Sequence, residues 1–196
     1  ATRVATASSV EAGAAHQAIR QFWIFTTLGL DALAITAQSL VGFFTGSDWV
    51  GQARRVAAYT CSWGAAMGVV ISVIMLLGRQ LAANLLVPPE AQAIFFLPWL
   101  AALLVQPLNG IAFVTDGIHW GTGDYAYLRN AVLLATLVGS LLLLSIDIEA
   151  DNALFGVWVA TVVWIIIRAF LGILRIWPGI GHAPLASGPG FKFNLQ

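Results

Sequence analysis

Five apolar stretches of about twenty residues run through this chain, and they constrain its fold more than any other feature. An α-helix rises about 1.5 Å per residue, so about twenty residues cross the roughly 30 Å hydrocarbon core of a bilayer. The stretches cover residues 18–41, 56–77, 91–118, 128–146 and 153–174, and glycine, proline or acidic segments separate them. The sequence therefore predicts an all-α polytopic membrane protein with five complete transmembrane helices, within a transmembrane region of residues 1–176.

Composition supports the bilayer as the solvent of this chain. Hydrophobic residues make up 59% of the sequence and charged residues 9%, whereas a soluble chain needs more polar surface to cover its core. Nine basic residues balance nine acidic ones, which argues against a nucleic-acid partner. The single cysteine, Cys61, excludes a disulfide framework and a thiolate metal site within the chain. Membrane lipid is the first expected partner.

The distribution of basic residues predicts an orientation, because cytoplasmic loops carry the excess of arginine and lysine. Six basic residues fall on one side of the predicted spans: Arg54, Arg55, Arg129, Arg168, Arg175 and Lys192. We therefore expect a cytoplasmic C-terminus, with residues 177–196 as a flexible cytoplasmic tail, and an N-terminus outside. Because the chain begins at Ala1 without a signal peptide, we expect a missing upstream segment, with residues 1–15 as the outer end of an interrupted sixth helix. The alternative is a chain whose first span inserts with its N-terminus outside.

Polar residues follow one side of the first predicted span, within and around "GLDALAITAQSL". Thr27, Asp31 and Gln38 stand at offsets of zero, four and eleven, which share a helix face, and Gln17 and Gln21 extend this stripe toward the outer end. A carboxylate near the bilayer centre costs on the order of 2.5 to 3.5 kcal/mol on insertion scales. Asp31 is therefore expected to face protein or water.

A second polar stripe lies in the third predicted span. Gln106, Asn109 and Asp116 stand at offsets of zero, three and ten. Pro98 and Pro107 lie in the same span, and each removes a backbone donor and bends its helix. A bent helix with a polar stripe suits a pathway that opens and closes.

Buried carboxylates of this kind can couple an ion to a conformation. Moving a carboxylate between a wet and a dry cavity changes its affinity for a proton, and a sodium ion could use the same carboxylate with amide and carbonyl oxygens. Asp31 and Asp116 are the predicted cation-coupling residues, with H+ and Na+ both open. The predicted substrate pathway comprises Gln17, Gln21, Thr27, Gln38, Gln106 and Asn109. The alternative is that both aspartates only accept hydrogen bonds from adjacent helices.

Other features point to packing rather than to chemistry. Gly64 and Gly68 form a GxxxG pattern in the second span, which permits close helix approach. The three histidines lack metal-ligand spacing, and no catalytic or nucleotide-binding motif occurs, so we expect no metal, no cofactor and no enzyme. Three rival functions stay open: a structural or regulatory membrane subunit, a flippase for a lipid intermediate, and a membrane enzyme built on His119, Asp116 and Asp124.

Two segments carry a resemblance to a known family. "GAAHQAIRQFWIF" followed by "LDALAITAQSLVG" resembles the eighth helix of multidrug and toxic compound extrusion transporters, especially their DNA-damage-inducible F branch. "FLPWLAALLVQPLNGIAFVTDGIHWGTGDYAYLRNA" resembles their tenth helix and the loop after it. Together these segments cover most of residues 12–135, and the last two spans fit the eleventh and twelfth helices by order and length.

The resemblance implies a twelve-helix antiporter of two six-helix lobes that exports drugs or other organic compounds against protons or sodium by alternating access. This chain would be the C-terminal lobe in a bacterial cytoplasmic (inner) membrane, working with an N-terminal lobe or a second copy of itself. Asp116 matches an acidic residue of the tenth helix that belongs to a cation site in some branches. Asp31 and Gln38 match polar positions of the eighth helix. The first-helix aspartate implicated in proton coupling in the F branch, and the acidic residue of the seventh helix, have no counterpart in the sequence.

Overall fold

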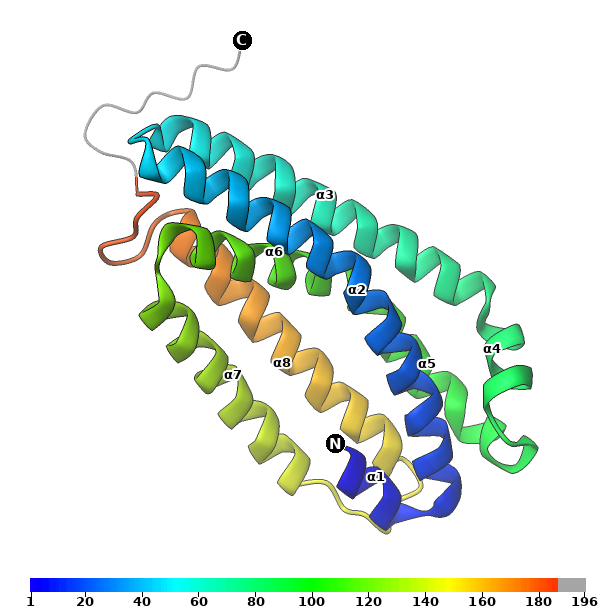
Figure 1. The fold of residues 1–196 in the computed structure, drawn as a ribbon. Helices are drawn as coiled ribbons and strands as arrows, with labels where there is room; N and C mark the ends of the chain where they lie inside the picture. Colours follow the sequence, from blue (N-terminus) through cyan, green and yellow to red (C-terminus); the bar gives the residue numbers. More distant parts are fainter. Residues whose placement is uncertain (187–196) are drawn as a thin grey trace.

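A computed structural model describes residues 1–186 of the chain, which are helical with no strand among them. The helices, shown in Figure 1, are α1 (Thr2–Ser8), α2 (Val10–Gly46), α3 (Val50–Leu77), α4 (Arg79–Leu86), the 3-10 helix η1 (Pro89–Ala91), α5 (Gln92–Leu104), α6 (Gln106–Thr122), α7 (Tyr125–Leu144) and α8 (Ala153–Ile176).

Four of these helices, α2, α3, α7 and α8, are long and apolar enough to cross a membrane. The segments Pro89–Leu104 and Gln106–Thr122 form a pair bent by 46°, which makes a fifth span if the pair is counted as one. The predicted fold class is thereby confirmed, and the helices coincide with the five predicted stretches. Helix α2 is longer than its predicted span of residues 18–41. Its 37 residues extend over about 55 Å.

The break between α5 and α6 has its cause in the sequence. Pro107 has no N–H group, so the carbonyl of Leu103, four residues earlier, cannot receive its usual helical hydrogen bond. The hydroxyl of Ser72 on α3 donates to this carbonyl oxygen at 2.5 Å. A freed backbone acceptor inside the bilayer must find a protein donor, and here a neighbouring helix supplies one.

Glycines let α6 approach α3 until the two backbones meet. A Cβ atom at Gly68 would lie 2.3 Å from the carbonyl oxygen of Gln106, and one at Gly110 would lie 2.0 Å from the carbonyl oxygen of Gly64. The packing role expected for the Gly64 and Gly68 pattern is therefore confirmed. Helix α2 packs against α6 in the same way, since a Cβ at Gly117 would lie 2.2 Å from the carbonyl oxygen of Ala34.

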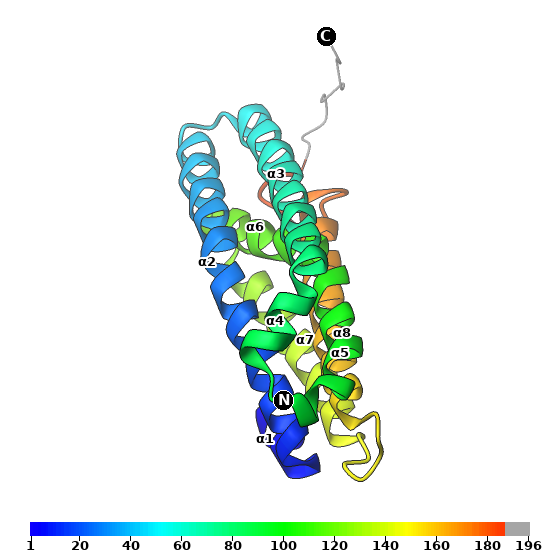
Figure 2. The same cartoon turned by 90° about the vertical axis from the view of Figure 1, so that its right-hand side faces the viewer.

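Helix α6 consequently lies at the centre of the bundle. It packs against α2, α3 and α8, while α7 packs mainly against α8 (Figure 1, Figure 2). Buried side chains form one cluster around Trp99, whose indole N–H donates to the carbonyl oxygen of Met75 at 3.0 Å, and a second around Val114 and Ile118.

The two ends of the described chain lie at opposite ends of the bundle, as five spans require (Figure 1). Helix α1 folds back on the start of α2, where the Ser9 hydroxyl accepts a hydrogen bond from the Ala12 N–H at 3.0 Å. At the other end, residues 177–186 pack on the lobe. Leu185 is 2% exposed, and Arg54 donates to its carbonyl oxygen.

This packing differs from the predicted flexible tail at residues 177–186. The apolar side chain of Leu185 is buried with Ile118 and Ile176, an arrangement that a glycine- and proline-rich composition does not reveal. The rest of the predicted tail, residues 187–196, lies outside the described residues.

Replacing Gly68 by alanine is expected to lower the free energy of unfolding by about 1 to 3 kcal/mol, because the new methyl group would overlap backbone atoms of Gln106 and Pro107. Gly29→Ala is the matched control, since a Cβ at Gly29 would meet nothing within 4 Å. Unfolding in mixed detergent micelles measures both variants. Equal stability of the two variants would contradict the proposed backbone contact.

Candidate functional site

A cavity of about 870 Å³ opens between α6, α7 and α8. Its polar and aromatic lining comprises Asp116 and Trp120 of α6, Tyr125 and Arg129 of α7, and Trp164 and Arg168 of α8. Aliphatic side chains of α7 complete the wall. Two arginines and one carboxylate on three membrane-spanning helices make this cavity the principal candidate site in the described part of the chain.

Asp116 and Arg168 form an ion pair across this cavity, between an Nη atom of the guanidinium and Oδ2 of the carboxylate. The side chain of Arg168 is 10% exposed and that of Asp116 is 22% exposed, so both are largely shielded from the surroundings of the lobe. The guanidinium carbon lies 4.3 Å from the ring centroid of Trp164 and 5.8 Å from that of Phe113, which adds cation–π attraction. The charges thus compensate each other inside a span, where an unpaired charge is costly.

A close contact between α6 and α8 brings the two charges together. Gly172 stands one turn after Arg168, and a Cβ at this glycine would lie 2.4 Å from the hydroxyl oxygen of Thr115. Thr115 precedes Asp116 and is fully buried. A glycine at position 172 therefore lets α8 approach α6 near the ion pair.

A second ion pair joins the same two regions nearer the helix ends. Arg175 donates from Nε and from Nη2 to the two carboxylate oxygens of Asp124, at 2.6 and 3.2 Å. His119 Nδ1 lies 3.8 Å from the same carboxylate, and the Arg175 guanidinium lies 4.8 Å from the ring of Tyr127. Arg175 also donates to carbonyl oxygens of the packed segment 177–186. This second pair fastens the α6–α7 turn to the end of α8.

The residues of the predicted polar stripe lie on one side of α2, and this side is mostly exposed. Gln17, Gln21, Asp31 and Gln38 are all exposed, and Thr27 is half-buried with its hydroxyl donating to the Ile24 carbonyl at 2.7 Å. Exposed apolar residues alternate with them along this side: Ile24, Leu28 and Ile35. The structure therefore does not bring Asp31 into the cavity of Asp116, and a role for these residues in a substrate pathway or in cation coupling stays a prediction.

Gln106 and Asn109 lie inside the lobe rather than on a surface. Both side chains are fully buried, and the Asn109 amide donates to Gln106 Oε1 at 3.3 Å. Gln106 Nε2 and Asn109 Oδ1 have no further hydrogen-bond partner within residues 1–186. They lie neither on the exposed side of α2 nor in the lining of the Asp116 cavity. Their assignment to a substrate pathway also stays a prediction.

Arg168 is a candidate site residue that the sequence alone did not identify. It was counted among the charges flanking the last span, but it lies within α8, eight residues before the helix ends, and is paired with Asp116. A lone arginine inside an apolar span needs a partner, so the sequence did indicate that Arg168 pairs with another residue. The pairing with Asp116 became visible only when α6 and α8 were placed against each other.

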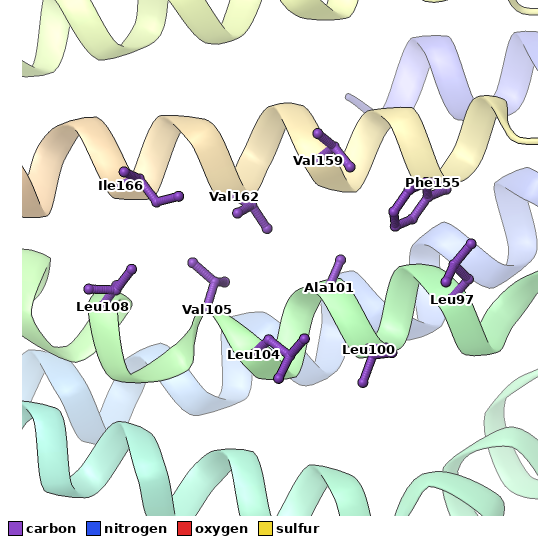
Figure 3. A pocket seen from close by; sticks show the side chains of 10 residues that line it. All are labelled: Leu97, Leu100, Ala101, Leu104, Val105, Leu108, Phe155, Val159, Val162 and Ile166. Carbon is purple, nitrogen blue, oxygen red and sulfur yellow. The ribbon is translucent and has the colours of Figure 1, made fainter.

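A second cavity, of about 370 Å³, lies between α8 and the bent pair α5 and α6 (Figure 3). Its wall is aliphatic except for Phe155, and Val105 at the helix break contributes to it. No charged or hydrogen-bonding side chain lines it. This cavity therefore offers no side-chain ligand for an ion.

The residues of the rival catalytic arrangement fall into two ion pairs. His119 lies beside Asp124, while Asp116 is held by Arg168 in a separate ion pair. No group of three histidine, cysteine or acidic side chains that could hold a metal ion occurs within residues 1–186.

The fold and the cavity define a polytopic membrane protein with a charge pair inside its spanning helices. Comparison with known families identifies its class further: the profile of the family described as MatE matches residues 3–145. The chain therefore belongs to the MatE family.

Curated relatives come from Arabidopsis thaliana. Protein DETOXIFICATION 42 is 27% identical over 86% of this chain and 32% of its own length, and Protein DETOXIFICATION 43 is 28% identical over the same shares. Protein DETOXIFICATION 44, chloroplastic, is 27% identical over 94% of this chain and 36% of its own length. The chain thus spans about a third of the length of these relatives. No solved structure matches the chain significantly.

Removing the carboxylate in Asp116→Ala is expected to lower the free energy of unfolding by about 3 kcal/mol, because the shielded guanidinium of Arg168 loses its partner. The double variant Asp116→Leu/Arg168→Leu should recover most of this stability, since it leaves no charge unpaired. Asp31→Ala is the control at an exposed carboxylate. Unfolding in mixed micelles measures all three, and equal losses for Asp116→Ala and Asp31→Ala would contradict the importance of the pair.

Proposed function

We propose that this chain forms the C-terminal lobe of a secondary active antiporter that exports drugs or other organic compounds in exchange for protons or sodium. The observation that carries the proposal is the Asp116–Arg168 pair, which lines a cavity of about 870 Å³ within the spanning helices. Membership of the MatE family supports the transport class.

The cavity suits a carboxylate that exchanges one cationic partner for another. Asp116 reaches the cavity with part of its side chain exposed, so a proton or a sodium ion can approach it there. In alternating access, two lobes rock about a site between them, and an ion that binds one state more tightly shifts the population toward it. Asp116 is the proposed coupling residue within this lobe.

The exposed side of α2 is the proposed surface toward the substrate. Its glutamines and Asp31 alternate with aliphatic side chains, and such a mixed surface can contact both the polar and the apolar parts of an organic compound. Gln17, Gln21, Gln38 and Asp31 would contact substrate from this lobe, with an N-terminal lobe or a second copy of the chain opposite.

The proposed setting is a bacterial inner membrane, with the chain in the DNA-damage-inducible F branch of the family. The sequence patterns of α2 and α6 support this branch. Arg54, Arg55, Arg129 and Arg175 lie at or near one end of the bundle, which supports a cytoplasmic C-terminus by the positive-inside rule.

Dye export by energised vesicles tests the lobe assignment. We expect vesicles that contain this chain together with a matching N-terminal lobe to export dye, and vesicles that contain the chain alone to export little, because a cleft between two lobes needs both walls. Export by the chain alone at the rate of the two-lobe vesicles would show instead that two copies build the cleft. Absence of export from both preparations would contradict the transport proposal.

Coupling is tested in the same vesicles with Asp116→Asn and Asp31→Asn. We expect Asp116→Asn to remove most of the dependence of export on pH or on sodium, because an amide neither titrates nor offers a charged ligand. Gln80→Ala, at an exposed amide of α4 away from the cavity, is the control for surface changes. Unchanged dependence in both aspartate variants would rule out the proposed coupling residues.

A further inference from the structure

We propose that Arg168 is a tethered counter-ion that competes with the transported cation for Asp116, so that cation binding loosens the contact of α8 with α6 around Arg168. This inference rests on the proposed function and adds a residue to it. Arg168 acts as a positioning residue, because it sets how tightly Asp116 binds the coupling ion.

The competition follows from the chemistry of the two partners. Oδ2 of Asp116 accepts a hydrogen bond from the Arg168 guanidinium, which supplies only donors, so a sodium ion meets a carboxylate whose single negative charge is already compensated. A proton on this carboxylate removes the negative charge that holds the guanidinium. If both cations stayed at Asp116, two positive charges would face one carboxylate inside a span, which is costly, so the ion competes with Arg168.

Arg168 can leave Asp116 without losing every favourable contact. Its guanidinium lies over the Trp164 ring, on its own helix, and near Phe113. A cation–π contact of this kind retains a displaced guanidinium at the edge of the cavity. Arg168 Nε is buried without a hydrogen-bond partner within residues 1–186, so the present arrangement does not satisfy all the donors of this side chain.

No other charged group in the cavity lining takes the place of Arg168. Arg129 and Tyr125 of α7 line the same cavity, and the Arg129 guanidinium donates to the side chain of Asn130. On α6 itself, His119 lies beside Asp124, and on α2 Asp31 is exposed outside this lining. Asp116 therefore has a single arginine partner, and the cavity offers a second arginine as a matched control.

Contacts of α8 that do not involve Asp116 determine how much of this helix the loss of the ion pair loosens. The Thr115–Gly172 contact and the Asp124–Arg175 pair lie between Arg168 and the end of α8, and neither includes Asp116. Near the start of α8, Trp158 is buried against Trp23 of α2, so both ends of the helix stay packed. Loss of the Asp116–Arg168 pair therefore loosens only the turns of α8 around Arg168.

Binding of radioactive sodium to the reconstituted chain, and pH titration of its carboxyl infrared band, test the competition without requiring transport. We expect Arg168→Gln to raise the affinity for sodium or for protons by at least about tenfold, since an adjacent opposite charge shifts the proton affinity of a carboxylate by about one to three powers of ten. Arg168→Lys should keep the affinity of the unchanged chain, and Arg129→Gln should change it much less. Equal effects of Arg168→Gln and Arg129→Gln would overturn the inference.

Hydrogen exchange on the unchanged chain provides a measurement that does not depend on the folding of a variant. Saturating sodium, or acid, should increase exchange in the turns of α8 around Arg168 but not in Arg175 and Ile176, and Asp116→Asn should abolish this response. An unchanged exchange pattern would contradict the loosening of α8 around Arg168.

If Asp116→Asn leaves ion binding intact, the coupling site itself is elsewhere and the proposed function fails. If it removes ion binding while Arg168→Gln has no effect, only the competition fails.

Discussion

Backbone-to-backbone contact of α6 with α2 and α3 is the arrangement on which the rest of this lobe depends. In a bilayer, lipid tails are as apolar as the helix surfaces, so helices associate through close packing and hydrogen bonds rather than through the hydrophobic effect. Gly68 of α3 and Gly110 of α6 let these two backbones meet, and Gly117 of α6 does the same toward α2. The bend before α6 depends on the same contact, because Ser72 of α3 satisfies the carbonyl that Pro107 leaves free.

The position of α6 in turn decides where charge can be accommodated. Asp116 and Asp124 lie on or just after this helix, and α8 supplies one arginine to each of them. The two pairs differ in their surroundings. Asp124 and Arg175 are held by two hydrogen bonds and by the segment 177–186, whereas Asp116 and Arg168 border an open cavity. The first pair is suited to fasten the helix ends, and the second lines the cavity.

Features that depend on a single segment of the chain, such as the length of a span, could be predicted from the sequence. The apolar lengths predicted five spans, and the structure has four long helices and one bent pair at those positions. The prolines predicted a bend, although not its location at Val105. The stripe on α2 was predicted from helical spacing alone, and four of its five residues share an exposed side. Helical spacing could not show that Gln106 and Asn109 are fully buried, because burial depends on the neighbours of a face and not on its periodicity.

That this chain is a bundle of membrane-spanning helices follows from its amino-acid sequence, since hydropathy and length act locally and the bilayer imposes one solution on each apolar segment. The sequence also shows which residues could carry charge or polarity within the spans. Which of these residues meet depends on how the helices pack. Asp116 and Arg168 are 52 residues apart in the chain, and no local rule relates their positions. They pair because Gly172 lets α8 approach α6 beside Thr115, and a charge within a span requires a partner that only the packing of two helices can provide.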